Sequence, residues 1–152
     1  MNRKANVPWV PSEAFAYTAF ANATPQQVWE ALQRFETWAG LGGVSQVFDP
    51  INDEHGLAGY RFAAEAAGRL YQGQARRVSV RTGEAMTMEI ETSEIKGVLD
   101  IRIEAWDSGS RLVIELTAHS KGFRAGLLFP IIAAAVGGGL PRNVDAFIAS
   151  LA

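Results

Sequence analysis

The pattern of hydrophobic positions changes three times along this chain. Residues 14–22 alternate between apolar and polar side chains, as in a strand with one buried face. Residues 24–38 carry apolar side chains at helical spacing, and strict alternation then returns from residue 44 to residue 120. The remaining residues are again helical in their spacing. This order predicts a strand, short helices, a run of strands and a final helix.

The first helical region has a well-marked beginning and end. Thr24 can cap a helix, Pro25 suits the first helical position, and Gln27 follows the cap by three residues, as in a capping box. The glycine-rich residues 40–43 end the pattern. An interruption near Phe35 fits either two short helices or one bent helix.

The alternating region predicts six strands in sequence. Apolar residues recur at every second position, and groups of turn-forming residues separate the segments. Short turns between consecutive strands predict an antiparallel meander, and its single polar face implies that helices cover the other face. The predicted strands are 44–48, 57–65, 68–80, 85–92, 95–106 and 111–119.

The C-terminal region should provide the main covering helix. Helical apolar spacing begins after Gly122 and continues to Leu151. Pro130 and Pro141 cannot both lie inside one straight helix, because each lost hydrogen bond costs about 3 kcal/mol. We therefore expect Pro130 near a helix start and a bend or break at residues 137–141.

The composition is that of one globular domain. The 152 residues are 48% hydrophobic and 20% charged, and no repeat or linker divides them. We expect a single domain over residues 1–152, with residues 1–12 as an irregular arm. Pro8 and Pro11 interrupt the only candidate export signal, so we place the protein in the cytoplasm. The uncharged residues 125–141 contain two prolines and favour a buried helix over a membrane span.

Several function classes are disfavoured by the charge and by the residue types. A net charge of −2 provides no basic excess for nucleic acid. The chain has no cysteine, and neither His55 nor His119 has a partner at metal-ligand spacing. We therefore predict no nucleic-acid partner, no metal site and no cofactor.

Two segments carry a resemblance to a known family. Residues 23–32, followed by Phe35 and Trp38, resemble the N-terminal signature of the polyketide cyclase/dehydrase and lipid-transport superfamily. This is the START-like, Bet v 1-like (SRPBCC) group, whose pattern there is a small residue, Pro, two polar residues, Val-Trp and a Leu three positions on. Residues 109–114 resemble its last turn and strand, with Ser110 in place of the usual Thr.

The resemblance extends over residues 14–151 and implies an α+β helix-grip fold. In that fold a curved antiparallel sheet of about seven strands, with two short helices after the first strand, wraps a long C-terminal helix. The C-terminal helix, kinked in this chain by its prolines, lies over an apolar cavity. Members of the family bind lipids, sterols, quinones, plant hormones or polyketides, and some catalyse aromatic cyclisation or dehydration. No residue pattern here selects one of these activities, and no catalytic residue is carried over.

The strand over residues 68–80 is the most informative candidate for a binding site. Val78 and Val80 predict its inward face, because apolar residues at period two mark the core side. The same phase turns Gln74 and Arg76 inward, where they would orient an oxygen or a carboxylate of a ligand. A bulge near Gly73 would instead return both side chains to solvent.

Other candidate cavity residues come from apolar faces. The predicted set also contains Tyr60, Phe62, Met86, Met88 and Ile132. Tyr71 could line the same pocket by its residue type, but it lies out of phase with Val78. Methionine suits irregular and adaptable surfaces. For each of these residues, ordinary core packing is the alternative.

Three functions follow from these patterns. The first is binding or transport of a small hydrophobic ligand such as a lipid, a quinone or a polyketide-like molecule. The second is a cyclase or dehydratase, in which Arg76 or Tyr60 polarises a carbonyl and His55 transfers a proton. In this second function His55, beside Asp53 in a loop, lies near the cavity mouth; a solvated loop histidine is the alternative. The third is a non-catalytic protein-interaction module. We expect no integral membrane association, and the sequence leaves the ligand and the oligomeric state open.

Overall fold

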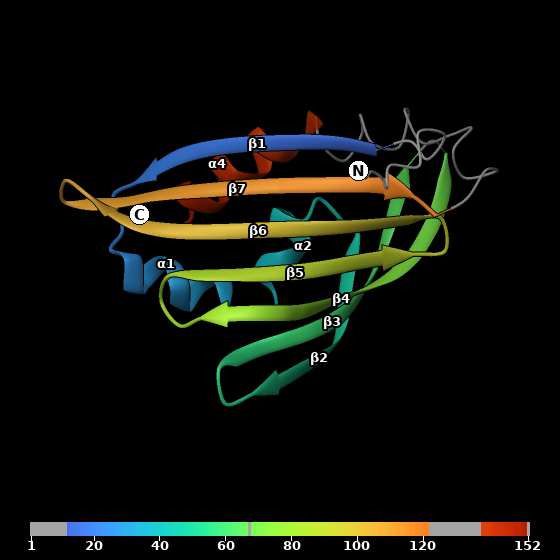
Figure 1. The fold of residues 1–152 in the computed structure, drawn as a ribbon, viewed down its shortest axis with the longest axis horizontal. Helices are drawn as coiled ribbons and strands as arrows, with labels where there is room; N and C mark the ends of the chain where they lie inside the picture. The colour runs from blue at the N-terminus through green and yellow to red at the C-terminus, as the bar shows by residue number, and fades with distance from the viewer. Residues whose placement is uncertain (1–11, 67, 122–137, 152) are drawn as a thin grey trace, which may run out of the picture.

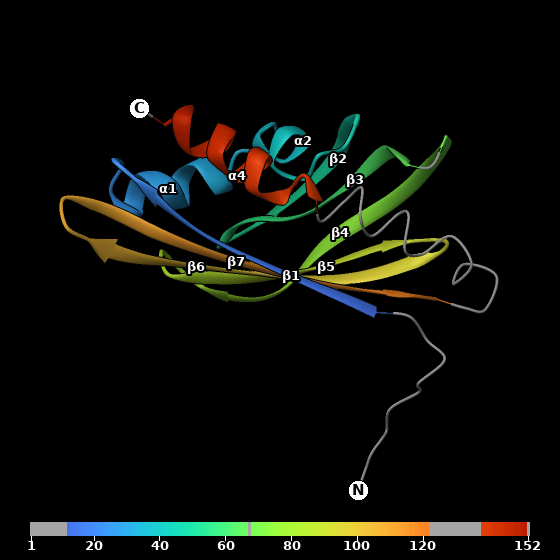
Figure 2. The same ribbon diagram turned by 90° about the horizontal axis from the view of Figure 1, so that it is seen from above.

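One antiparallel sheet organises the molecule. The computed structural model describes residues 12–66, 68–121 and 138–151 (Figure 1). Its seven strands lie in the order β1-β7-β6-β5-β4-β3-β2. The helices lie on one side of this sheet, and the strands β2 to β4 curl toward them (Figure 2). The predicted helix-grip α+β fold is confirmed.

The boundaries of the elements follow the predicted patterns with one clear difference. The β2 strand continues through residues 49–53, which follow the predicted strand 44–48. It can do so because Asp49 adopts a positive φ of 56° and the register with β3 shifts after Phe48. The strands are β1 (Ser12–Ala21), β2 (Gln46–Asp53), β3 (Gly56–Ala66), β4 (Arg69–Arg81), β5 (Ala85–Thr92), β6 (Ile95–Trp106) and β7 (Gly109–Ser120). The helices are α1 (Pro25–Leu32), α2 (Thr37–Leu41) and α4 (Leu140–Ala149).

The capping box predicted at the start of α1 is present. The Gln27 backbone N–H donates to Thr24 Oγ1 over 3.1 Å, and the Thr24 backbone N–H donates to Gln27 Oε1 over 2.8 Å. The helix ends at Leu32, and the separate helix α2 begins at Thr37. The Trp38 indole N–H donates to the Leu32 carbonyl oxygen over 2.9 Å and joins the two helices.

The turn at Gly109 and Ser110, which belongs to the segment that resembles the family, has a defined structural role. Ser110 is buried, and its hydroxyl donates to the carbonyl oxygen of Ala23 over 2.6 Å. A Cβ on Gly109 would lie 2.0 Å from the carbonyl oxygen of Ala21, so the position requires glycine. The β6–β7 turn is thereby attached to the segment that leads into α1.

The inward phase of β4 differs from the prediction. Arg77 pairs with Met88 but Ser79 pairs with Thr87, so Val78 is an extra residue on β4. This β-bulge changes the phase of the strand, and Val78 is 44% exposed.

The side chains of β4 before the bulge therefore point to the face of the sheet opposite to the predicted one. Tyr71 and Ala75 are buried, whereas Gln74 and Arg76 are exposed. The predicted inward orientation of Gln74 and Arg76 is wrong. The alternative of a phase-shifting bulge is correct in kind, but the bulge lies at Val78 and not near Gly73.

The described part of the C-terminal helix is α4. It packs against α2 and β1, and the Tyr17 hydroxyl donates to Asp145 Oδ1 over 2.7 Å. Pro141 lies in its first turn, which agrees with a helix boundary between residues 137 and 141. The predicted helix start at Pro130 and the candidate Ile132 lie outside the described residues. No helix in the described ranges is long and apolar enough to cross a bilayer.

Candidate functional site

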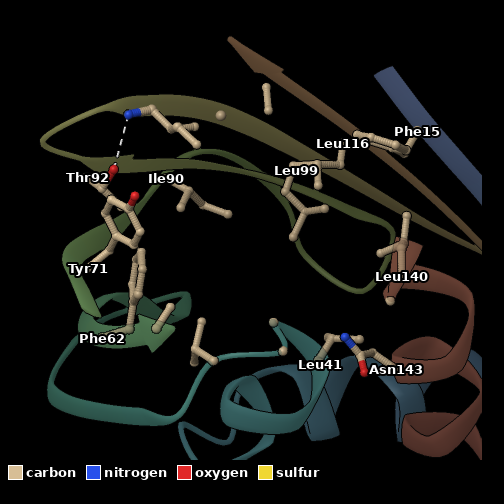
Figure 3. Close-up of a pocket in the computed structure, with 18 of the residues that line it drawn as sticks. Phe15, Leu41, Phe62, Tyr71, Ile90, Thr92, Leu99, Leu116, Leu140 and Asn143 are labelled. Atoms are coloured by element: carbon tan, nitrogen blue, oxygen red, sulfur yellow. Dashed lines mark hydrogen bonds between the residues drawn. The ribbon is translucent and has the colours of Figure 1, made fainter. Parts of the chain in front are cut away.

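A cavity lies between the concave face of the sheet and the helices α2 and α4 (Figure 3). Its volume is about 230 Å³. Strands β1 and β3 to β7 contribute its walls, and most of the side chains that face it are aliphatic or aromatic. Among the residues that line it are Phe15, Leu41, Phe62, Tyr71, Ile90, Thr92, Leu99, Leu116, Leu140 and Asn143.

Small residues on the inner face of the sheet create much of this space. Gly97 on β6 and Ala118 on β7 are register partners, and both line the cavity. Farther along the same strands, the larger side chains of Ile101 and Ile103 belong to the packed core, where α1 lies on β6 and β7. The sheet is therefore filled where α1 lies on it and hollow where the first turn of α4, with Leu140 and Asn143, lines the cavity.

Aromatic rings from β3 form one side of the cavity. Tyr60 and Phe62 are two residues apart and point to the same face, with ring centroids 6.3 Å apart. The centroid of the Tyr60 ring lies 6.3 Å from that of Phe35 and 5.9 Å from that of Trp38. These contacts connect Tyr60 to the helical layer. Such contacts hold the rings in defined positions.

The Tyr60 hydroxyl is in an apolar environment. Burial raises the pKa of the Tyr60 hydroxyl well above its usual range. The group therefore stays protonated at neutral pH and can donate a hydrogen bond. It has no hydrogen-bond partner in the part of the chain that the structure describes.

Two hydroxyl groups lie at the β4–β5 end of the cavity. Tyr71 is 7% exposed, and its buried hydroxyl has no hydrogen-bond partner among the described residues. The Thr92 Oγ1 accepts from the backbone N–H groups of Glu94 and Ile95, over 3.2 and 3.1 Å. Figure 3 shows both side chains at the same end of the cavity, opposite Asn143.

The predicted site residues are distributed over three environments. Tyr60 and Phe62 lie in the cavity wall, and their contact with a ligand stays a prediction. Met86 and Met88 are fully buried in the packed core and are not among the described lining residues. Gln74 and Arg76 lie on the outer face, where the Arg76 guanidinium pairs with Glu89 over 2.7 Å.

The sequence-based reasoning missed Thr92, and it left Tyr71 out of the predicted set because Tyr71 lies out of phase with Val78. An inward orientation of Tyr71 could have been inferred from Gly73 and Ala75. They follow it at every second position, and such small residues can lie on a crowded inner face. Val78 and Val80 predict the opposite phase more strongly. Val78 is the bulge residue and Val80 lies beyond it, so neither residue indicates the phase of the strand at Tyr71. Thr92 lies opposite Gly73 in the register of β4 and β5.

The candidate base His55 lies away from the cavity. It is exposed in the turn between β2 and β3, and it is not among the described lining residues. Its backbone N–H, and not its ring, donates to Asp53 Oδ1 over 2.9 Å. Among the described residues, no hydrogen bond or ion pair joins the His55 imidazole to the Asp53 carboxylate.

The Asp53 carboxylate instead pairs with a buried arginine. The side chain of Arg77 is 6% exposed and donates to Asp53 Oδ2 over 2.5 Å and to the Leu57 carbonyl oxygen over 2.7 Å. The hydrogen bond from Arg77, with that from the His55 backbone, lowers the pKa of Asp53 below its usual range. Arg76 and Arg77, which are neighbours on β4, thus point to opposite faces of the strand.

Within the described ranges, no three histidine, aspartate or glutamate side chains come together in a way that could hold a metal ion. The cavity lining offers mostly apolar contact, with hydrogen bonding from a few hydroxyl groups and from the side chains of Glu65, Arg142 and Asn143.

Solved structures with the same fold come from distant relatives. A protein from Thermus thermophilus superposes with a TM-score of 0.72 at 15% identity, covering 91% of this chain and 97% of that one. A START superfamily protein from Mycobacterium smegmatis has a TM-score of 0.64 at 9% identity, covering 91% and 99%. A norcoclaurine synthase point mutant from Thalictrum flavum, solved with a transition state analogue, has a TM-score of 0.64 at 12% identity, covering 93% and 95%.

These identities are low, so the superpositions show the fold alone. A search of curated proteins found no match. At the level of families, residues 13–152 match the family described as polyketide cyclase / dehydrase and lipid transport. This match extends over nearly the whole chain and agrees with the resemblance seen at residues 23–32 and 109–114. The chain belongs to the polyketide cyclase / dehydrase and lipid transport family.

Proposed function

We propose that this protein binds and carries a small, neutral, hydrophobic molecule in the cavity between its sheet and α4. The observation that carries the proposal is the cavity itself, with about 230 Å³ of space and mostly apolar walls. An apolar cavity of about 150 Å³ is enough to bind benzene. A ligand of two fused rings or a short acyl chain is therefore of suitable size.

Burial alone can provide useful affinity in such a site. An apolar ligand that buries about 300 Å² gains roughly 7 kcal/mol before the costs of association, at about 25 cal/mol per Å². No extended set of polar contacts is needed for this gain. The family description and the fold of the START superfamily relative support the same kind of ligand. We retain the cytoplasm as the proposed location.

A cyclase or dehydratase is less well supported by the positions of the candidate groups. Of the three side chains proposed for proton transfer and carbonyl polarisation, only Tyr60 lines the cavity. Arg76 is on the outer face and His55 is in an exposed turn. An enzyme built on this cavity would have to take its proton-transfer group from residues other than His55.

The test is a titration with a neutral apolar fluorophore, N-phenyl-1-naphthylamine. Ala64 lines the cavity, whereas its neighbour Ala63 faces the other side of β3, opposite Gln46 and Gln72. The substitution Ala64→Leu should fill part of the cavity and weaken dye binding about tenfold or more, by about 1.4 kcal/mol. The matched variant Ala63→Leu should bind like the wild type. Equal binding by all three proteins would contradict the proposal, as would a wild type that does not bind the dye.

A further inference from the structure

The β4–β5 end of the cavity contains hydrogen-bonding capacity that the described protein does not use. Buried hydroxyl groups in native proteins nearly always have a partner. Tyr71 is more than nine-tenths buried and lines the cavity, yet its hydroxyl has no described partner. This group can donate one hydrogen bond to whatever enters the cavity.

Thr92 presents a second donor beside it. A hydroxyl oxygen has two lone pairs and one proton. Both lone pairs of Thr92 Oγ1 are engaged by the backbone N–H groups of Glu94 and Ile95, so only its proton is left to bond. No described acceptor takes that proton, and no hydrogen bond joins Thr92 to Tyr71. Figure 3 shows the two hydroxyl groups at one end of the cavity.

The surrounding charges argue against an anionic ligand at this end. Arg69 lies over the Tyr71 ring, 5.4 Å from its centroid, and its guanidinium is paired with Glu94 over 3.6 Å. The ammonium of Lys121 is paired with Glu91 over 2.7 Å and also donates to the Thr92 carbonyl oxygen. Each of these cations is already matched by a carboxylate.

The number of donors points to one kind of polar group. A carboxylate has about four lone-pair sites, and burying it with two neutral donors would leave it poorly compensated. A carbonyl oxygen has two lone pairs and no charge. Two O–H donors therefore match one neutral carbonyl oxygen.

We propose that the hydroxyl groups of Tyr71 and Thr92 both donate to a single carbonyl oxygen of a neutral, otherwise apolar ligand. The inference rests on the proposed function and narrows it to neutral carbonyl compounds such as ketones and esters. The apolar part of the ligand lies toward Leu99, Leu116 and Leu140 in the rest of the cavity (Figure 3).

The experiment compares two probes of the same shape by calorimetric titration. One is 2-acetylnaphthalene, and the other is 2-isopropenylnaphthalene, in which a C=CH₂ group replaces the C=O group. The wild type should bind the ketone about tenfold more tightly than the alkene, as two neutral hydrogen bonds would provide. The variant Tyr71→Phe should lose most of this preference and keep its affinity for the alkene. Thr92→Ser retains the hydroxyl and should keep the preference.

A spectroscopic measurement adds a readout that needs no variant. Hydrogen bonding from two hydroxyl groups should lower the C=O stretching frequency of 2-acetylnaphthalene on binding to the wild type. In Tyr71→Phe the shift should be smaller. This result would separate direct contact with the carbonyl from an effect of Tyr71 on packing.

The outcomes that overturn the inference differ from those that overturn the proposed function. Equal affinity for ketone and alkene, an unshifted carbonyl band, or a preference that survives in Tyr71→Phe would overturn this inference alone. Tighter binding of 2-naphthoate than of the ketone would overturn the assignment to neutral ligands. Failure to bind either probe or N-phenyl-1-naphthylamine would overturn both proposals.

Discussion

The tip of the Phe62 ring occupies the space where a side chain on Gly73 would lie. The two residues are register partners on β3 and β4, and a Cβ on Gly73 would be 2.6 Å from Phe62 Cζ. The same Cβ would be 2.5 Å from the carbonyl oxygen of Glu91 on β5. The absence of a side chain at Gly73 thus lets an aromatic ring of the cavity wall lie close to the sheet.

The substitution Gly73→Ala should therefore destabilise the fold. We expect a loss of about 1–3 kcal/mol, the range for overpacking of a well-filled site, because both the ring and a backbone oxygen must move. Urea unfolding measures the change in free energy. Gly97→Ala is the control, since its Cβ would meet nothing closer than 3.5 Å, and it should be neutral or slightly stabilising. A Gly73→Ala protein as stable as the wild type would contradict this account of the wall.

The Asp53–Arg77 pair should make stability depend on acid pH. Because the pKa of Asp53 is lowered in the folded state, its contribution is complete above the ordinary value of 3.8 and is lost as the pH falls through the folded value. Asp53→Asn should lower the melting temperature at pH 7, where the buried Arg77 loses its carboxylate. The difference from the wild type should shrink as the pH falls below 3.8. A gap that is constant from pH 7 to strongly acidic pH would exclude this role for the carboxylate.

The Tyr17–Asp145 hydrogen bond should hold α4 against β1. Removing the donor with Tyr17→Phe should speed amide hydrogen exchange in α4 and leave β6 unchanged, because only the helix is attached through this bond. The hydrogen bond to Asp145 raises the pKa of Tyr17, so the contribution is complete below about pH 10 and is lost as the pH rises through the raised value. Tyr71→Phe removes a hydroxyl with no described partner and is the control. Equal exchange in α4 for wild type and Tyr17→Phe would count against the contact.

The buried Ser110 hydroxyl should stabilise the junction between β7 and α1. Ser110→Ala leaves the Ala23 carbonyl oxygen without its side-chain donor, and such a loss costs about 1–3 kcal/mol. Ser110→Thr keeps the hydroxyl, and Thr is the usual residue in the family-like turn, so this variant should retain more stability than Ser110→Ala. Thermal unfolding of both variants provides the comparison. The account would be wrong if Ser110→Ala unfolded at the temperature of the wild type.

The order of elements could be predicted because it depends on local signals. The capping box at Thr24 and Gln27 defines the start of α1 from neighbouring residues alone. Period-two alternation located all six strands after the helices, since alternation is a property of a single strand in a half-buried sheet. The segment 109–114, which resembles the family, also has a structural role, because the buried Ser110 lies in it.

The wall of the cavity could not be predicted to the same extent. The phase of β4 was predicted from Val78 and Val80, and it is reversed upstream by the bulge at Val78, where β4 has one more residue than β5. A bulge depends on how two strands pair, which no single strand reveals. Met86 and Met88 have the same alternation as Leu99, yet they lie in the filled core and Leu99 faces the cavity.

The sequence by itself determined the fold class, the places of the strands and the capped first helix, because these follow from short-range periodicity and turn chemistry. Only the tertiary structure decided which inward residues meet a helix and which meet open space. It placed Tyr71 and Thr92 together from two strands and moved Gln74 and Arg76 to the outer face. The physical reason is that register and the position of α4 set the cavity, and both arise from contacts between residues far apart in the chain.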